Sequence, residues 1–273
     1  MSQFISLLPP TASLSASYDP TKLAADQPAR DIPTTFKDAM TVRERVFVEE
    51  QGVPLENEFD DDDPRCFHWV VYASVGTSSS SNGNGSNSAS PLSNGTHNDS
   101  ESPSPQEERR QSDPTANRVA VGTIRLVPPP HPPHPAPSDH HKLDNSLHAP
   151  ATGMQANGSR ASEPYIKLGR LAVLPAYRKL GLAALLMRTA LDWAAQNSYQ
   201  ILSPPRPEEV ELAKAEGRDV DLESWNGLAL VHAQIQLERF YSRFGFVKDE
   251  EMGEWDEEGI QHIGMWSTLK LRE

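Results

Sequence analysis

The segment Leu168–Ala195 constrains the fold most, because it places a strand, a short turn and a helix in direct succession. The apolar run Leu171–Val173 predicts the end of the strand, Arg178–Ala183 form the turn, and an amphipathic helix follows. The first amide groups of a helix have no partners within it, and the helix dipole makes that end positive. Gly181 and Ala183 carry little side-chain bulk, so a ligand phosphate has room to approach the backbone. This order predicts an anion-binding loop.

Net charge and the placement of basic residues limit the class of ligand. The chain has a formal net charge of -13, whereas a nucleic-acid binder needs a basic face. Basic side chains gather near the loop, at Lys167, Arg170, Arg178, Lys179 and Arg188. We therefore expect a phosphorylated small molecule and no nucleic acid.

Cysteine and hydropathy patterns bear on the compartment. The chain has one cysteine, Cys66, which excludes an internal disulfide and a thiolate zinc site and fits a reducing compartment. No run reaches the roughly 20 apolar residues that a membrane span needs, and the first residues lack the basic flank of a signal peptide. We expect a cytoplasmic or nucleocytoplasmic protein with no membrane partner. The histidines between Pro128 and Pro164 lack the spacing of a metal site, so no metal is predicted.

Composition predicts a single domain that is interrupted by insertions. Three segments are low in complexity and too poor in apolar residues to offset their ordering entropy: 77–117, 128–164 and 202–226. We predict that they are disordered. Residues 1–30, rich in Ser, Ala and Pro, are predicted to form a flexible tail, which leaves 31–273 as the domain.

Residue periodicity predicts an α/β (α+β) fold with a mixed central sheet flanked by helices. Helical spacing is found over three segments: 38–51, 178–196 and 233–244. Strands are expected at 31–36, 68–73, 118–127, 165–173 and 228–232, followed by a final hairpin over 246–266. Two strand–helix–strand connections imply parallel pairs within the sheet.

Two motifs resemble signatures of the GNAT N-acetyltransferases. The R-x-x-G-x-A pattern over Arg178–Ala183 resembles their acetyl-CoA pyrophosphate loop, and Phe240–Phe246 resembles their F-Y-x-x-x-G-F signature. In these enzymes the tyrosine hydroxyl lies near the CoA sulfur, where a hydrogen-bonded acid eases departure of the thiolate. The resemblance makes Tyr241 the candidate acid. The alternative is an aromatic residue that packs a helix against the sheet.

A wider set of segments looks like the ElaA/YjcF-type branch of this family. The matching segments are Arg43–Gln51, the acidic turn after it, Leu168–Val173 and Glu258–Met265. The resemblance implies a GNAT fold and direct transfer of an acetyl group from acetyl-CoA to a primary amine, without a metal. It also implies which residues hold acetyl-CoA: Leu171, Ala172, Val173, Arg178, Lys179, Leu180, Gly181, Leu182 and Ala183. The backbone N–H of Val173 is then the candidate oxyanion donor.

The general base is not specified by the resemblance. Some GNAT enzymes place a glutamate on the strand before the loop, but Lys167 stands there and cannot accept a proton while charged. The remaining candidates are Glu50, Glu58, Asp60, His232 and His262. For Glu58 and Asp60 a solvated turn is favoured, whereas for Glu50 a substrate-facing role is. His262 is equally compatible with a packed hairpin residue and a functional one.

The acceptor also stays open at this point. A small amine, a polyamine or an amino sugar such as glucosamine 6-phosphate would each satisfy the resemblance. A protein or peptide acceptor is one alternative. Because a strand carboxylate is missing and the insertions could dock partners, a non-catalytic CoA-binding interaction module is another. A homodimer is compatible with all of them.

Overall fold

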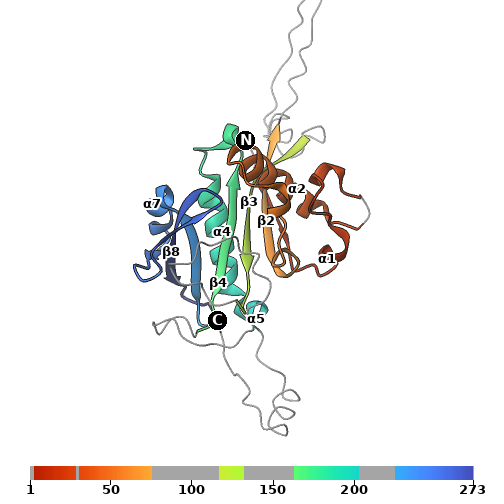
Figure 1. Cartoon of the computed structure of the whole chain (residues 1–273). Coiled ribbons are helices and arrows are strands. Elements are labelled where there is room, and N and C mark those ends of the chain that lie inside the picture. The colour runs from red at the N-terminus through yellow and green to blue at the C-terminus, as the bar shows by residue number, and fades with distance from the viewer. Residues whose placement is uncertain (1–2, 29–30, 76–116, 132–162, 203–224, 273) are drawn as a thin grey trace, which may run out of the picture.

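The structure is a computed structural model that describes residues 3–28, 31–75, 117–131, 163–202 and 225–272. Most of the three predicted insertions therefore lies outside the described residues. Within the described part, an eight-stranded sheet has the order β1-β2-β3-β4-β5-β8-β6, with β7 paired to β8 (Figure 1). The strands are β1 (Gln3–Leu8), β2 (Phe67–Val75), β3 (Asn117–Val127), β4 (Ile166–Val173), β5 (Leu228–Gln234), β6 (Val247–Lys248), β7 (Glu254–Glu257) and β8 (Ile260–Thr268).

Helices accompany this sheet. The α-helices are α1 (Leu14–Ser17), α2 (Thr34–Arg43), α4 (Leu182–Gln196), α5 (Ser198–Ile201) and α7 (Glu238–Ser242). A π-helical segment, Glu44–Glu50, continues α2. Single 3-10 turns lie at Ala24–Asp26, Leu55–Asn57, Asp63–Arg65, Pro175–Tyr177 and Ile235–Leu237. The predicted fold class, a mixed α/β sheet flanked by helices, is confirmed.

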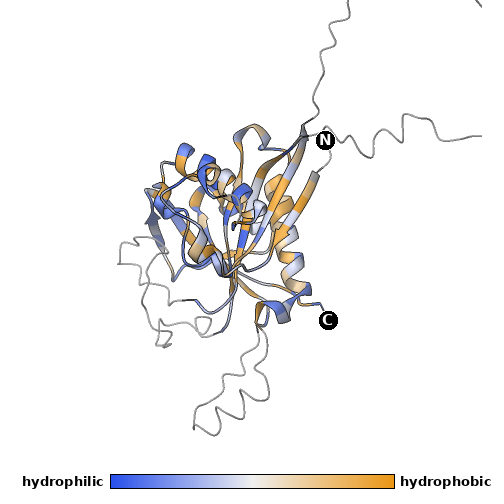
Figure 2. Cartoon of the chain, turned by 90° about the vertical axis from the view of Figure 1, so that its right-hand side faces the viewer, coloured by the Kyte–Doolittle hydropathy of each residue, from blue (hydrophilic) through white to orange (hydrophobic). Residues whose placement is uncertain are grey.

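The core lies between the sheet and α4, and the alternation of β2 shows how it is built. Because successive side chains of a strand point to opposite faces, Trp69 and Val71 pack with Leu186 of α4. The intervening His68 contacts Phe36 of α2 instead. The two long helices thus cover opposite faces, and the central strands are largely hydrophobic (Figure 2). The sequence had placed Trp225 in an insertion, but its side chain belongs to the same core.

The beginning of the chain differs from its prediction. Residues 3–8 form an edge strand paired antiparallel with β2, and Leu14 and Tyr18 are buried against Phe36. The predicted flexible tail is therefore wrong for residues 3–28, which are part of the domain. The predicted strand at 31–36 is also wrong, because helix α2 begins at Thr34 directly after Pro33.

Three other element boundaries are corrected. Helix α4 begins only at Leu182, so residues 178–181 are a loop. The predicted helix 233–244 is shorter in the structure. Strand β5 continues to Gln234, a 3-10 turn follows, and only α7 is α-helical. Among the described strands only β4 and β5 pair in parallel, so one of the two expected parallel pairs is absent there.

Truncation of Leu14 tests whether the N-terminal residues belong to the fold. Leu14 is fully buried, whereas Leu23 is 45% exposed. We expect Leu14→Ala to lower the free energy of unfolding by about 2–5 kcal/mol, and Leu23→Ala to change it by less than about 0.5 kcal/mol. Urea unfolding followed by circular dichroism measures both. Equal, negligible effects would contradict the packing of this segment.

Candidate functional site

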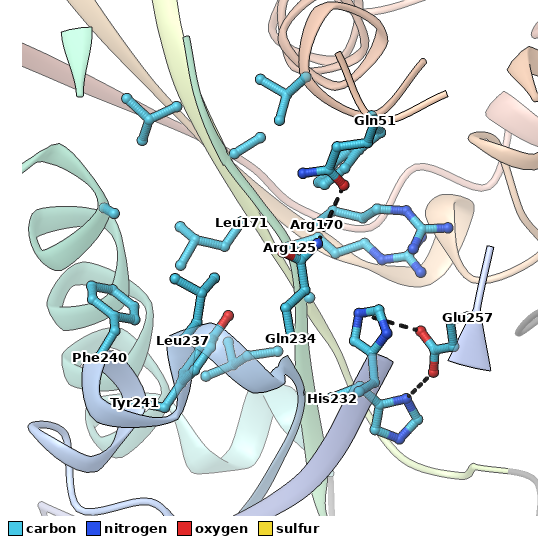
Figure 3. A pocket seen from close by; sticks show the side chains of 18 of the residues that line it. Gln51, Arg125, Arg170, Leu171, His232, Gln234, Leu237, Phe240, Tyr241 and Glu257 are labelled. Carbon is cyan, nitrogen blue, oxygen red and sulfur yellow. Dashed lines mark hydrogen bonds and ion pairs between the residues drawn. The ribbon is translucent and has the colours of Figure 1, made fainter. Parts of the chain in front are cut away.

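A cavity opens where β4 and β5 separate. The two strands pair only from Ile166 to Leu168, opposite Ala229 to Val231. Beyond that point they line a cavity of about 480 Å³ together with the π-helical segment and α7, a volume typical of small-molecule sites. Figure 3 views it with Gln234 between the side chains of Tyr241 and His232.

A bulge in β4 shapes one wall of this cavity. Thr123 pairs with Ala172 and Arg125 with Gly169, so Arg170 and Leu171 together oppose a single residue of β3. Arg170 adopts the left-handed region, with φ 49°, which is uncommon for a residue other than glycine. Both bulged residues line the cavity. A bulge re-aims side chains in this way, and nothing in the local sequence signals it.

The predicted anion-binding loop is built as expected from its residue types. Lys179 and Gly181 have positive φ, 64° and 80°, and α4 starts at once with Leu182. A Cβ atom on Gly181 would meet nothing within 4 Å, so close packing within the chain does not explain this glycine. The open space beside the first helical amides leaves room for a phosphate. Ala183, in the first turn, lines the cavity.

The side chain of Arg178, which was expected to add positive charge near the loop, contacts Glu50. Its Nη1 and Nη2 atoms lie 2.7 and 2.5 Å from the two carboxylate oxygens, and its Nε donates to the carbonyl of Val173 at 3.0 Å. Hydrogen bonds from the guanidinium lower the pKa of Glu50. A carboxylate that accepts a bidentate pair is a poor proton acceptor, so the geometry weakens the case for Glu50 as the base.

Tyr241 lies on α7 with its hydroxyl pointing into the cavity (Figure 3). Its side chain is buried, and desolvation raises its pKa to about 12 because burial disfavours the phenolate. The hydroxyl therefore keeps its proton at neutral pH and can donate it. The neighbouring ring of Phe246 packs edge-on against Tyr241, which holds the phenol in place.

Two histidines meet a carboxylate on the other side of the cavity. Glu257 Oε1 lies 3.0 Å from Nδ1 of His232, and Oε2 lies 3.9 Å from Nε2 of His262. Trp255 donates its indole N–H to Oε1 at 2.7 Å. The hairpin β7–β8 supplies three of these groups and β5 supplies His232. Sequence analysis proposed both histidines but missed Glu257, which the hairpin register brings between them.

The acidic turn is not solvated, contrary to the prediction for Glu58 and Asp60. Both carboxylates are buried, and a third, Asp63, is fully buried beside them. Arg125 donates to Asp60 from both terminal nitrogens at 2.6 Å and to Asp63 at 2.9 Å. Arg43 donates to Glu58 at 2.9 Å and to Asp63 at 2.7 Å. These five side chains form a buried charge network, in which Glu58 and Asp60 serve as acceptors for arginine.

The bulge connects this network to the cavity. Arg170 reaches Asp60 at 3.2 Å while it also lines the cavity. The two guanidinium groups of the network hold the pKa of Asp63 well below its usual range, since nearby positive charge favours the carboxylate. Burial lowers the pKa of the adjacent His68 to about 4. One signal in the sequence was Arg125 itself, a charged residue between the apolar residues Ile124 and Leu126.

Two features are absent from the residues that the structure describes. No group of three or more His, Cys, Asp or Glu side chains among them could hold a metal ion. None of the helices in the described ranges has both the length and the apolar character to cross a membrane.

Comparisons with known proteins found a match to one family model over part of the chain and similar solved structures. Residues 112–203 match the family described as "Acetyltransferase (GNAT) family". An acyl-CoA N-acyltransferase structure from Pseudomonas aeruginosa is similar at 16% identity and a TM-score of 0.42, covering 98% of this chain and 100% of that chain. Escherichia coli ElaA is similar at 16% identity and a TM-score of 0.42, covering 97% and 99%. No curated protein matches the chain.

Removing the carboxylate of Asp63 tests the charge network. Because two buried guanidinium groups would each lose one of their two carboxylate partners, we expect Asp63→Ala to lower the free energy of unfolding by about 3–5 kcal/mol. The adjacent Asp62 pairs with Arg65 at a partly exposed site, so Asp62→Ala serves as the control and should cost less than about 1 kcal/mol. Guanidinium chloride unfolding compares them, and similar small costs would contradict the account.

Proposed function

We propose that this chain is an acyl-CoA N-acyltransferase that transfers acetyl from acetyl-CoA to a primary amine of a small molecule. The match of residues 112–203 to the acetyltransferase (GNAT) family supports this proposal. One observation carries this proposal: the cavity at the β4–β5 separation has the glycine loop at its edge and a protonated tyrosine in its wall. These two features suit a cofactor that has both a pyrophosphate and a reactive thioester.

The cavity edge offers backbone groups for the CoA moiety. From Gly169 onward β4 has no pairing with β5, so we assign Leu171–Val173 to the pantetheine arm, which would lie along β4 in the manner of an added strand. We assign the backbone of Arg178–Ala183 to the pyrophosphate, because the open space at Gly181 leaves the helix start accessible. Arg178 contributes here by holding Glu50, which keeps that carboxylate from repelling the phosphates.

Three groups carry the proposed chemistry. The Val173 N–H stabilises negative charge that develops on the thioester oxygen. Tyr241, which keeps its proton at neutral pH because burial raises its pKa, gives that proton to the departing thiolate. His262 accepts the proton of the amine. We favour it over Glu50 because Glu50 already accepts two hydrogen bonds from Arg178.

A panel of acceptors tests the activity itself. We expect the purified chain to release CoA thiol from acetyl-CoA with at least one class among alkyl amines, polyamines and amino sugars, glucosamine 6-phosphate included. A panel of lysine peptides separates a protein acceptor from a small one. Binding of CoA without thiol release for any amine would overturn the proposed transfer.

Replacing Tyr241 by phenylalanine tests the acid. The variant keeps the buried ring and removes the proton, so we expect turnover to fall by about 100-fold or more, while acetyl-CoA affinity changes by less than about twofold. Tyr177, which packs near the loop without lining the cavity, supplies the control Tyr177→Phe. Unchanged turnover in Tyr241→Phe would remove this residue from the acid role.

A charged side chain at Gly181 tests the phosphate loop. We expect Gly181→Glu to abolish detectable CoA binding in a calorimetric titration, because the carboxylate would occupy the anion site. Gly259 also has positive φ, 81°, and open space around its Cβ position, so Gly259→Glu matches the backbone strain at a different place. Weakened binding in both variants, or in neither, would contradict the assignment of the loop.

A further inference from the structure

Three glutamine side chains form a chain of hydrogen bonds in the cavity between β4 and β5. Gln236 Nε2 donates to Gln234 Oε1 at 2.8 Å, and Gln234 Nε2 donates to Gln51 Oε1 at 3.2 Å. All three residues line the cavity, and Figure 3 shows the bond between Gln51 and Gln234 as a dashed line. Because the amide oxygens of Gln234 and Gln51 each accept one of these bonds, the chain ends in the NH2 group of Gln51, which has two hydrogens to donate.

The position of this NH2 group is fixed from two sides. Gln51 directly follows the π-helical segment, where Gly52 adopts φ 78° and the N–H of Val53 donates to the carbonyl of Phe47 at 2.9 Å. A left-handed glycine with such a bond is a common and stable helix end. The side-chain oxygen of Gln51 is held by Gln234, the last residue of β5. A donor that is held in place in this way loses little entropy when it binds a ligand.

The NH2 group of Gln51 is the polar group that this wall of the cavity offers to a ligand. Val46 and Phe47 line the cavity with apolar side chains. Glu50 lines it too, but Arg178 binds both of its carboxylate oxygens. Within the part of the chain that the structure describes, Gln51 Nε2 has no hydrogen-bond partner. A ligand that displaces water from this NH2 group must supply an oxygen, because an unpaired donor costs free energy.

The amide pair of Gln51 and Gln234 lies apart from the loop that we assign to CoA. Both residues also line a smaller cavity of about 90 Å³. Among the described residues that line this smaller cavity, none belongs to Leu171–Ala183. Gln234 pairs directly with His262, the proton acceptor of the proposed transfer. The oxygen that Gln51 binds therefore belongs to the acceptor, at a position close to its nitrogen.

The charged groups beside the amide pair indicate which kind of oxygen fits. Glu258 lines the smaller cavity, and its carboxylate accepts a hydrogen bond from the neutral amide of Asn57 at 3.0 Å. Arg170 also lines this cavity, but it donates to Asp60. The negative charge of Glu258 would repel a carboxylate or a phosphate on the ligand. A hydroxyl group is neutral, and it can accept from the amide of Gln51 while it donates its own hydrogen to a carboxylate.

We propose that Gln51 Nε2 donates a hydrogen bond to a hydroxyl oxygen of the acceptor, so that the chain selects amines that carry a hydroxyl group near the nitrogen. Amino alcohols and amino sugars meet this requirement, whereas plain alkyl amines and polyamines do not. A site built to bind a hydroxyl group rejects an analogue without it, because its own donor is then left unpaired. This inference rests on the proposed acetyl transfer and narrows the class of its acceptor.

Matched acceptors test this selection with the full chain. Ethanolamine is compared with propylamine, and glucosamine with cyclohexylamine, since the members of each pair are similar in size and differ in hydroxyl groups. We expect kcat/KM of the wild type to be higher for the hydroxylated member by about tenfold or more. Gln51→Leu removes the donor, so this preference should disappear, while the KM for acetyl-CoA should change by less than about twofold.

A second variant keeps the size of the side chain. Gln51→Glu retains an oxygen for Gln234 and replaces the NH2 group by an acceptor, so the preference for hydroxylated amines should again be lost. The new carboxylate should also raise kcat/KM for spermidine, because it attracts a second ammonium group. Gln200 is exposed and lines neither cavity, so Gln200→Glu makes the same change in net charge and should leave the preference intact. Thermal unfolding by circular dichroism shows whether each variant is folded.

The outcomes distinguish this inference from the function on which it rests. Thiol release by the wild type with equal kcat/KM for both members of each pair would overturn the hydroxyl site alone. A preference that persists in Gln51→Leu or in Gln51→Glu would also overturn it, as would a rise in the KM for acetyl-CoA without a loss of preference. Absence of thiol release by the wild type with every amine would overturn the proposed function and this site with it.

Discussion

Strands β4 and β5 share backbone pairing only from Ile166 to Leu168, and the cavity exists because they separate beyond that point. The bulge at Arg170 and Leu171 turns β4 away, and the loop before α4 begins five residues past the end of β4. Backbone N–H and C=O groups that would pair with each other in a continuous sheet then face the cavity. The anion loop, the tyrosine on α7 and the hairpin β7–β8 all surround that one gap.

A buried charge network supports this geometry from one side. Arg170 adopts an uncommon backbone conformation, and its side chain ends at Asp60, which Arg125 also holds. Such ion pairs contribute little net stability compared with apolar packing, but removal of one partner is costly. The network therefore acts mainly to fix where the bulge and the acidic turn lie. The position of the cavity wall therefore depends on buried carboxylates behind it, Asp60 and Asp63, which do not line the cavity themselves.

Features that short segments determine could be predicted from the sequence. Features that depend on the register between distant strands could not. The strand, turn and helix around Gly181 and the helix that carries Tyr241 follow from short segments. Both helices were predicted, although each begins later than expected. The bulge at Arg170, the burial of Asp60 and the meeting of Glu257 with His262 depend on pairing between distant strands, so no single segment signals them. Residues 3–28 were misjudged because their Ser- and Pro-rich composition hides a few apolar residues that the sheet buries.

A crystal structure of the chain with CoA would test the central claim most directly, which is that the gap between β4 and β5 receives the acyl donor. The account predicts the pyrophosphate on the amides around Gly181, the pantetheine arm along Leu171–Val173, and the sulfur within hydrogen-bonding distance of the Tyr241 hydroxyl. CoA bound away from the β4–β5 gap, or with its sulfur remote from Tyr241, would contradict it.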